Sequence, residues 1–175
     1  MTIKTIFLDR DGVINKEINY LYKIEDFKFI SGVFEACQYL KKLNYEIIIV
    51  TNQSGISRGF YTEHDYQILN SWMMGQFNKN NISILDVFHC PHLPEKNCNC
   101  RKPKPGMFLK AQHKYNIDMQ NSWLIGDKEA DIVAANHAGI RNTILVKSGH
   151  KINEIDTKAK YILDSIHQAN KVIIN

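Results

Sequence analysis

Two carboxylates one residue apart stand at the end of a short apolar stretch near the start of the chain. The stretch Ile6-Phe7-Leu8 runs directly into Asp9-Arg10-Asp11-Gly12. Strand alternation predicts that Asp9 and Asp11 point to the same side, and like charges that close repel one another unless a cation holds them. Mg²⁺ is typically held by one or two protein carboxylates together with substrate phosphate oxygens. The pair therefore indicates phosphate chemistry at a divalent cation, although an acidic strand end is also typical of a solvated turn.

Three further blocks of polar residues suit the same chemistry. They are Thr51-Asn52-Gln53-Ser54, Arg101-Lys102-Pro103-Lys104, and Asp127 with the residues up to Asp131. Asp9, Thr51 and Asp127 each follow an apolar run, and ligands of open parallel sheets bind beyond the carboxyl ends of the strands. Three segments far apart in the sequence can therefore meet at one crevice.

Some roles within these blocks stay open from the residues alone. Thr51-Asn52 is either a phosphate-binding turn or an ordinary polar turn. Lys102 and Lys104 are both candidates for a cation on a phosphoryl group, and their spacing does not decide between them. Asp131 either supports the metal site from outside or is simply an acid near a helix N-terminus, where negative charge is favourable.

A second set of metal ligands lies within eleven residues. Cys90, His92, Cys98 and Cys100 offer three thiolates and one imidazole, which match a tetrahedral structural zinc site. Disulfides are the alternative, but a histidine within the pattern and an intracellular setting argue against them. The fourth cysteine of the chain, Cys37, lies on an apolar helix face and is expected to be a buried small hydrophobe. Because Arg101 and Lys102 directly follow the last ligand, zinc would fix the loop that presents these cations.

The elements that must position these residues alternate along the chain. We expect strands at Thr5–Leu8, Glu46–Val50, Val87–His89, Ser122–Ile125, Thr143–Val146 and Tyr161–Leu163. Between them, helical spacing predicts a helix capped by Ser31, a second with a Thr62/Asp65 capping box, a third over Gly106–Tyr115 and a fourth from Glu129 to Gly139. This alternation predicts a parallel α/β sheet in a single domain covering residues 1–175.

Composition agrees with an ordinary globular enzyme. The chain has 175 residues, 44% hydrophobic and 23% charged, and its net charge of +4 comes from Lys and Arg scattered among acids. Such scatter predicts no nucleic-acid partner. No apolar run reaches the roughly 20 residues that span a bilayer, and the N-terminus lacks the apolar region and cleavage site of a secretion signal. We expect a cytoplasmic protein without a membrane partner, acting as a monomer.

As a set, the blocks resemble the haloacid dehalogenase superfamily of phosphatases over roughly residues 3 to 146. The resemblance implies a Rossmann-like parallel sheet with helices on both faces, with the first and fourth strands side by side. It implies that Asp9 is a nucleophile that forms an aspartyl-phosphate and that Asp11 is the acid/base. It implies Mg²⁺ held by Asp9, Asp127 and the backbone carbonyl of Asp11, with Thr51 and Lys102 on the phosphoryl group.

The combination of DRDGVIN, TNQSGI, the Cys/His cluster with RKP, and GDKEAD narrows the resemblance. It is similar to the D-glycero-D-manno-heptose 1,7-bisphosphate 7-phosphatases, which supply heptose for lipopolysaccharide and other bacterial surface polysaccharides. The histidinol-phosphate phosphatases of histidine biosynthesis share the zinc loop and are the alternative. No large cap domain fits in this length, so loops must shape access to the site. The implied substrate-binding residues are Glu17, Ile18, Asn19, Tyr20, Asn52, Gln53, Ser54, Arg101 and Lys128.

Substrate charge favours the bisphosphate. A heptose bisphosphate carries a second phosphate outside the reacting site, and Arg101 could supply its cation, whereas histidinol phosphate carries an amine that would prefer an acid such as Glu17. Two readings from other classes explain less. A zinc-stabilised binding module leaves the aspartates without a role, and a nucleic-acid 3′-phosphatase predicts a basic stripe that the sequence lacks.

Overall fold

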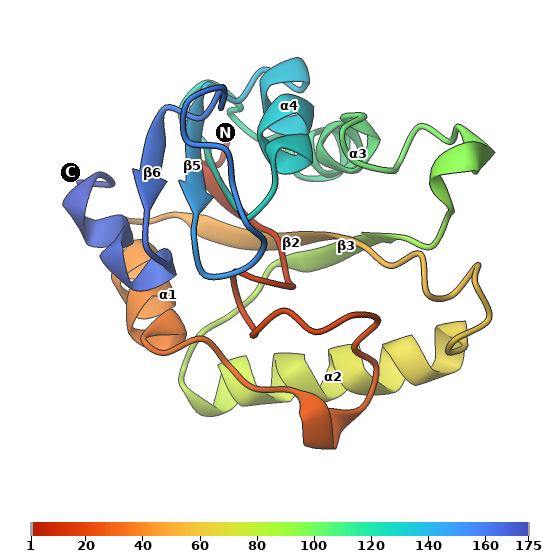
Figure 1. Ribbon diagram of the computed structural model, residues 1–175. Coiled ribbons are helices and arrows are strands. Elements are labelled where there is room, and N and C mark those ends of the chain that lie inside the picture. The colour runs from red at the N-terminus through yellow and green to blue at the C-terminus, as the bar shows by residue number, and fades with distance from the viewer. Residues whose placement is uncertain (1, 175) are drawn as a thin grey trace.

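The computed structural model describes residues 2–174 and contains one six-stranded parallel sheet (Figure 1). Its strands run in the order β3-β2-β1-β4-β5-β6. Their bounds are β1 Thr5–Leu8, β2 Glu46–Asn52, β3 Asp86–Cys90, β4 Trp123–Gly126, β5 Asn142–Val146 and β6 Tyr161–Leu163. The sequence thus locates all six strands and misses their ends by at most two residues.

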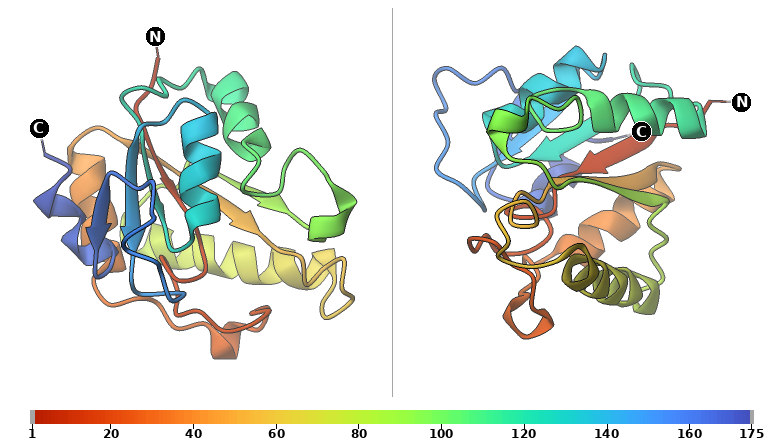
Figure 2. Two further views of the ribbon diagram at one scale, coloured as in Figure 1. Left: turned by 45° about the horizontal axis from the view of Figure 1, so that its top comes forward. Right: turned by 90° about the vertical axis from the view of Figure 1, so that its right-hand side faces the viewer.

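Helices cover both faces of the sheet (Figures 1 and 2). Helices α1 (Val33–Lys42) and α2 (Glu63–Lys79) pack on one face with the 3₁₀ turn Ile166–Lys171, and α3 (Gly106–Tyr115) and α4 (Glu129–His137) pack on the other. Each face has its own apolar core, and β1 contributes to both because its four residues alternate between them and are all buried. The predicted α/β class with a parallel sheet is confirmed.

Two helix ends test the capping predictions. The Thr62 hydroxyl accepts a hydrogen bond from the Asp65 N–H, and Asp65 in turn accepts from the Thr62 N–H, so the predicted capping box is confirmed. The Ser31 cap is wrong. The residue before α1 is Gly32 in the left-handed region (φ 80°), and no side chain caps this helix. An added Cβ at Gly32 would collide with His167, so the close approach of the C-terminal segment decides this helix start.

The strand order places the functional blocks. The chain leaves β1 toward β2 on one side and later returns to pair β4 on its other side, so the order reverses between β1 and β4. Leu8 pairs with Ile49 in β2 and with Ile125 in β4, which aligns the carboxyl ends of all three strands. Ligands of open parallel sheets bind at such a reversal. Within residues 2–174, no helix is long and apolar enough to cross a bilayer.

Candidate active site and metal-binding cluster

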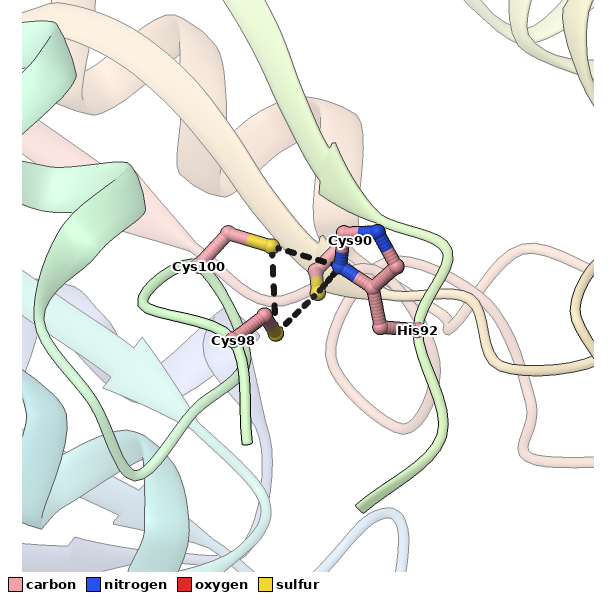
Figure 3. Close-up of side chains that lie close together, drawn as sticks. All are labelled: Cys90, His92, Cys98 and Cys100. Atoms are coloured by element: carbon pink, nitrogen blue, oxygen red, sulfur yellow. Dashed lines mark hydrogen bonds between the residues drawn. The ribbon is translucent and has the colours of Figure 1, made fainter. Parts of the chain in front are cut away.

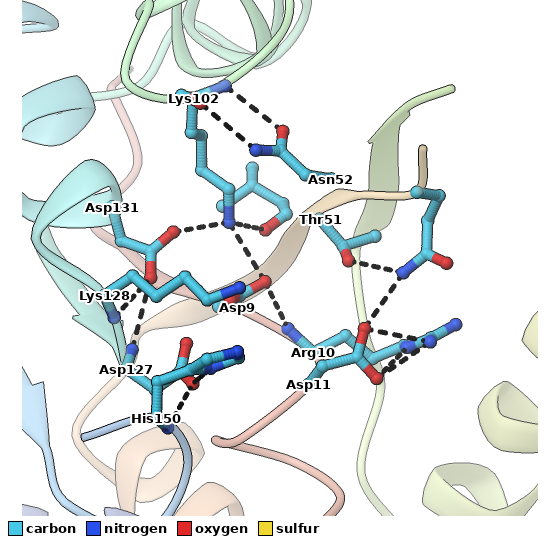
Figure 4. A network of polar contacts seen from close by, with 12 residues as sticks. Asp9, Arg10, Asp11, Thr51, Asn52, Lys102, Asp127, Lys128, Asp131 and His150 are labelled. Atoms are coloured by element: carbon cyan, nitrogen blue, oxygen red, sulfur yellow. Dashed lines mark hydrogen bonds and ion pairs between the residues drawn. The ribbon is translucent and has the colours of Figure 1, made fainter. Parts of the chain in front are cut away.

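Asp9 and Asp127 meet where β1 and β4 end side by side. The Asp9 N–H donates to the carbonyl of Ile125 at 3.0 Å, which extends the β1–β4 pairing by one residue into the site. Oxygens of Asp9, Asp127 and Asp131 lie within 4.8 Å of one another, and all three residues are buried. Figure 4 shows these side chains converging from the end of β1, from the β4–α4 turn and from the first turn of α4.

Lys102 reaches into this carboxylate group from the loop that follows β3. Its Nζ lies 3.0 Å from Asp9 Oδ1 and 2.7 Å from Asp131 Oδ1, and it donates to the carbonyl of Val50 at 2.8 Å. Burial alone would lower the pKa of Lys102, but the carboxylates of Asp131 and Asp9 raise it above the usual value, so the side chain is a cation. Lys104 instead donates to Asn97, away from the carboxylates.

Asp131 has a structural role in addition to its contact with Lys102. Its second oxygen, Oδ2, accepts the backbone N–H groups of Asp127 at 3.2 Å and Lys128 at 3.0 Å. One carboxylate therefore caps the start of α4 and orients the lysine that contacts Asp9. The place of Asp131 near a helix N-terminus is confirmed, and its support of a metal site stays a prediction.

The charge balance of this group fits a divalent cation. Burial raises the pKa of Asp9 well above its ordinary value, and although Lys102 opposes the shift, Asp131, Asp127 and Asp11 add to it. Lys102 therefore does not offset the combined effect of burial and the neighbouring carboxylates on the pKa of Asp9. Among the described residues, Asp127 Oδ1 is buried without a hydrogen-bond partner, and such a carboxylate oxygen is the ligand that Mg²⁺ prefers. Asp9 and Asp127 are thus suited to hold Mg²⁺.

Asp11 lies beyond the end of β1 at Leu8 and lines the same cavity as Asp9. Its carboxylate accepts from the Arg10 guanidinium at 2.8 and 2.9 Å, from Asn15 Nδ2 at 3.0 Å and from Gln53 Nε2 at 3.0 Å. Arg10 itself is only 1% exposed. Asp11 is therefore held rigidly while its carboxylate still lines the pocket.

The segment after β2 supplies a wall of the pocket and an anchor for Lys102. Asn52, Gln53 and Ser54 line the pocket, whereas Thr51 is buried and its hydroxyl accepts from Gln53 Nε2 at 2.8 Å. The Asn52 side chain pairs with the backbone of Lys102, accepting its N–H at 3.1 Å and donating to its carbonyl at 3.2 Å. This two-bond pairing joins the loop to β2 at the residue that contacts Asp9 (Figure 4).

His150 is a site residue that the sequence reasoning missed. The ring Nδ1 of His150 lies 2.6 Å from Asp127 Oδ2, and the backbone N–H of His150 donates to the same oxygen at 3.0 Å. The ring Nε2 lies 3.7 Å from the carboxylate of Glu17. It reaches the site because Gly149 and Gly12 cross closely, and an added Cβ at either glycine would collide with Asp127. Gly12 has a φ of 84°, which favours glycine. The only sequence signal was a glycine in a polar segment after the fifth strand.

A cavity of about 290 Å³ opens in front of these groups. Its walls include every substrate-binding residue expected from the sequence, namely Glu17, Ile18, Asn19, Tyr20, Asn52, Gln53, Ser54, Arg101 and Lys128. Arg58, Tyr61 and His150 also line it, and none of these three was predicted. Burial, followed by the charge of Asp11, raises the pKa of Glu17 to about 7, so this carboxylate titrates near neutral pH.

The predicted zinc ligands come together at the end of β3 (Figure 3). Cys98 Sγ lies 3.5 Å from both Cys90 Sγ and Cys100 Sγ, and His92 Nδ1 lies 3.6 Å from Cys90 Sγ and 3.3 Å from Cys100 Sγ. A tetrahedral zinc with bonds of about 2.3 Å separates its sulfurs by roughly 3.8 Å, whereas a disulfide requires about 2.05 Å. All four cysteines are unbridged, and Cys37 is buried in α1 as expected. The donor set and its spacing fit zinc.

Comparison with known proteins adds an independent finding. Residues 99–169 match a family model described as HAD-hydrolase-like. A D-glycero-alpha-D-manno-heptose-1,7-bisphosphate 7-phosphatase of Photorhabdus laumondii is 47% identical over 98% of this chain and 97% of its own. A D-glycero-beta-D-manno-heptose-1,7-bisphosphate 7-phosphatase of Pasteurella multocida is 43% identical over 97% of this chain and 96% of its own.

A solved structure agrees with these relatives. The crystal structure of D,D-heptose 1,7-bisphosphate phosphatase from B. bronchiseptica, in complex with magnesium and phosphate, superposes with a TM-score of 0.84 and is 27% identical. The match covers 95% of this chain and 96% of the other.

Proposed function

Because the chain belongs to the family of heptose 1,7-bisphosphate 7-phosphatases within the HAD superfamily, we propose that it removes the 7-phosphate of D-glycero-D-manno-heptose 1,7-bisphosphate with Mg²⁺. The observation that carries this proposal is the contact of Lys102 Nζ with both Asp9 and Asp131 beside the unpartnered oxygen of Asp127. This group can hold a phosphate monoester against a buried carboxylate. Phosphoryl transfer needs little more than positioning and charge neutralisation.

In this mechanism Asp9 attacks the phosphorus and forms an aspartyl-phosphate. Lys102 and the Arg10 N–H both contact Asp9 Oδ1, which keeps the carboxylate in place while Oδ2 is left for attack. Mg²⁺ bound by Asp9, Asp127 and the Asp11 carbonyl would neutralise charge on the phosphoryl oxygens. Asp11, held by Arg10 and Gln53, acts in its protonated form and gives its proton to the alcohol oxygen as the bond from that oxygen to phosphorus breaks. It then takes a proton from the water that attacks the phosphorus, which breaks the bond to Asp9 and releases phosphate.

We further propose that Cys90, His92, Cys98 and Cys100 bind a structural zinc ion. Arg101 and Lys102 follow directly, and Arg101 donates to the carbonyl of His92 at 3.1 Å, so the ligand loop and the cations form one unit. Zinc would hold this loop in the conformation that brings Lys102 to Asp9. In the cell, the reaction would provide heptose for nucleotide activation and then for lipopolysaccharide or another surface polysaccharide.

A substrate comparison with purified protein tests the proposal. We expect Mg²⁺-dependent phosphate release, with kcat/KM highest for an anomer of heptose 1,7-bisphosphate and lower for fructose 1,6-bisphosphate and histidinol phosphate. Acid quenching during turnover should trap an acid-stable, hydroxylamine-sensitive phosphoryl group on Asp9. A higher kcat/KM for histidinol phosphate would contradict the substrate assignment.

A further inference from the structure

The proposed substrate carries two phosphates, and the cations near Asp9 account for only one of them. Lys102 contacts Asp9 and Asp131, and Lys128 extends from the turn after β4 toward Asp9 (Figure 4). Arg101 directly precedes Lys102, and its guanidinium donates to the carbonyl of His92. These three side chains stand on the wall formed by the zinc loop and the start of α4. Because the sugar separates the two phosphates, the second phosphate needs a cation of its own.

Another permanent cation lines the cavity from a different segment. Arg58 lies in the turn between β2 and α2, where its N–H donates to the carbonyl of Ser54 at 3.0 Å. The Phe60 N–H donates to the carbonyl of Gly55 at 3.0 Å, so the backbone on both sides of Arg58 is held. Within residues 2–174, no carboxylate lies within ion-pair distance of Arg58. Its charge is therefore available to a ligand.

Aromatic contacts orient this arginine at the cavity mouth. Its guanidinium carbon lies 5.8 Å from the centre of the Tyr20 ring, and Tyr20 meets Phe60 edge to face at 4.6 Å. Tyr20 has a φ of 58°, a conformation that residues with a Cβ seldom adopt, and such outliers cluster where a ligand is held. A guanidinium in cation–π contact with a ring can still donate its N–H groups to an anion.

We propose that Arg58 binds the phosphate that the enzyme does not remove. This inference rests on the proposed function and moves the distal-phosphate contact from Arg101 to the turn between β2 and α2. A guanidinium can form two parallel hydrogen bonds with a phosphate, which suits recognition of a dianion at a fixed distance from the reacting phosphate. Arg58 is then a specificity-determining residue that separates sugar bisphosphates from monophosphates.

Steady-state kinetics with two substrates test this role. In Arg58→Gln, we expect KM for heptose 1,7-bisphosphate to rise about 10- to 100-fold, the usual effect of losing a charge-assisted contact. We expect kcat for the bisphosphate to change less than its KM, and KM for heptose 7-phosphate to change less than threefold. Arg58→Lys should recover part of the loss. Arg141→Gln, which removes an exposed arginine outside the cavity, is the matched control and should behave as wild type.

Product inhibition gives a second readout. Heptose 1-phosphate retains the phosphate in question, so its inhibition constant should rise with KM in Arg58→Gln, whereas inhibition by inorganic phosphate should not. Equal KM increases for both substrates, or no increase, would overturn the assignment, as would a selective loss in Arg101→Gln alone. A wild-type enzyme with no preference for the bisphosphate would instead overturn the proposed substrate, and this outcome is visible before any variant is made.

Discussion

At the scale of residues, the site is a balance among buried charges. Asp9, Asp127 and Asp131 bring three carboxylates into a space that excludes most water, and Lys102 is the cation in direct contact with two of them. A buried ion pair contributes little net stability, but removing one partner leaves an uncompensated charge. Substitutions here should therefore separate effects on catalysis from effects on folding.

Asp9→Asn keeps the shape of the side chain and removes the attacking charge. We expect phosphatase turnover to fall to background while circular dichroism and the elution volume stay those of the wild type. The measurement is phosphate release under saturating substrate. Substantial turnover by Asp9→Asn would rule out the aspartyl-phosphate route.

Lys102→Met should be both inactive and unstable. Without the cation, Asp9 and Asp131 face each other unpaired, and we expect the free energy of unfolding to fall by about 3–5 kcal/mol. Lys104→Met is the matched control, because the Lys104 ammonium contacts only Asn97 among the described residues, and its change should stay within about 0.5 kcal/mol. Urea denaturation of both variants measures the difference. Equal losses would show that the carboxylates do not depend on Lys102.

Glu17 gives the site a pH-dependent contribution to stability. Burial, and then Asp11, raise its pKa from 4.5 to about 7 in the folded protein. The folded state therefore binds the proton more tightly than the unfolded state, and stability falls as the pH rises from about 4.5 to 7. We expect Glu17→Gln to raise the melting temperature relative to wild type more at pH 8 than at pH 4.5, without added Mg²⁺. Glu25→Gln, an exposed change nearby, is the control, and an increase independent of pH would contradict the shift.

At the scale of elements, strands and helices followed from the sequence, whereas loop conformations did not. Apolar runs located all six strands because both faces of a parallel sheet are buried and the runs are continuous. The capping box at Thr62 has a local pattern and was found. The start of α1 depends on His167, 135 positions away from Gly32, and no local pattern reports such a contact.

The contrast between regular elements and loops also explains which site residues the sequence could indicate. Asp9 and Asp127 follow strands in compact motifs, and Lys102 directly follows the Cys/His cluster, so all three were candidates from the sequence, and their chemical roles stay predictions. His150 and Arg58 reach the cavity through the paths of two loops, and neither lies in a motif with a recognised spacing. Strand alternation predicted that Asp9 and Asp11 point to the same side, and both line the cavity although β1 itself ends at Leu8.

The loop that carries Cys90, His92, Cys98 and Cys100 can be tested by direct metal analysis. We expect metal analysis of the purified protein to find about one zinc ion per chain that survives dialysis, because three thiolates bind zinc tightly. Cys100→Ser should lower both zinc content and activity through misplaced Lys102. Cys37→Ala removes a cysteine buried in α1 and should keep full zinc content. Wild-type protein without stoichiometric zinc would reject the site.

At the scale of the whole molecule, the sheet positions the loops at its carboxyl end, and these loops carry the residues of the site. The two apolar cores lie on opposite faces of the sheet, and Leu21 of one core also lines the cavity, whose other walls are mostly polar and charged residues. The segments after β1, β2, β3, β4 and β5 all contribute to the cavity, so substrate access is shaped without a separate cap. The site can therefore change its preferences through loop residues while the cores stay the same.

The pairing of Asn52 with the backbone of Lys102 has a consequence for how this loop can evolve. Two hydrogen bonds from the Asn52 side-chain amide hold the backbone of Lys102 at the end of β2, whichever residues lie between His92 and Cys98. We therefore expect insertions between His92 and Cys98 to leave the position of Lys102 unchanged.

A Gly-Ser insertion after Glu95 should retain kcat within about threefold, because each doubling of loop length costs only about 0.6 kcal/mol. Asn52→Asp, which replaces the donor to the Lys102 carbonyl with an acceptor, should lower kcat more than the insertion does. The reverse order would show that loop length sets the position of the lysine.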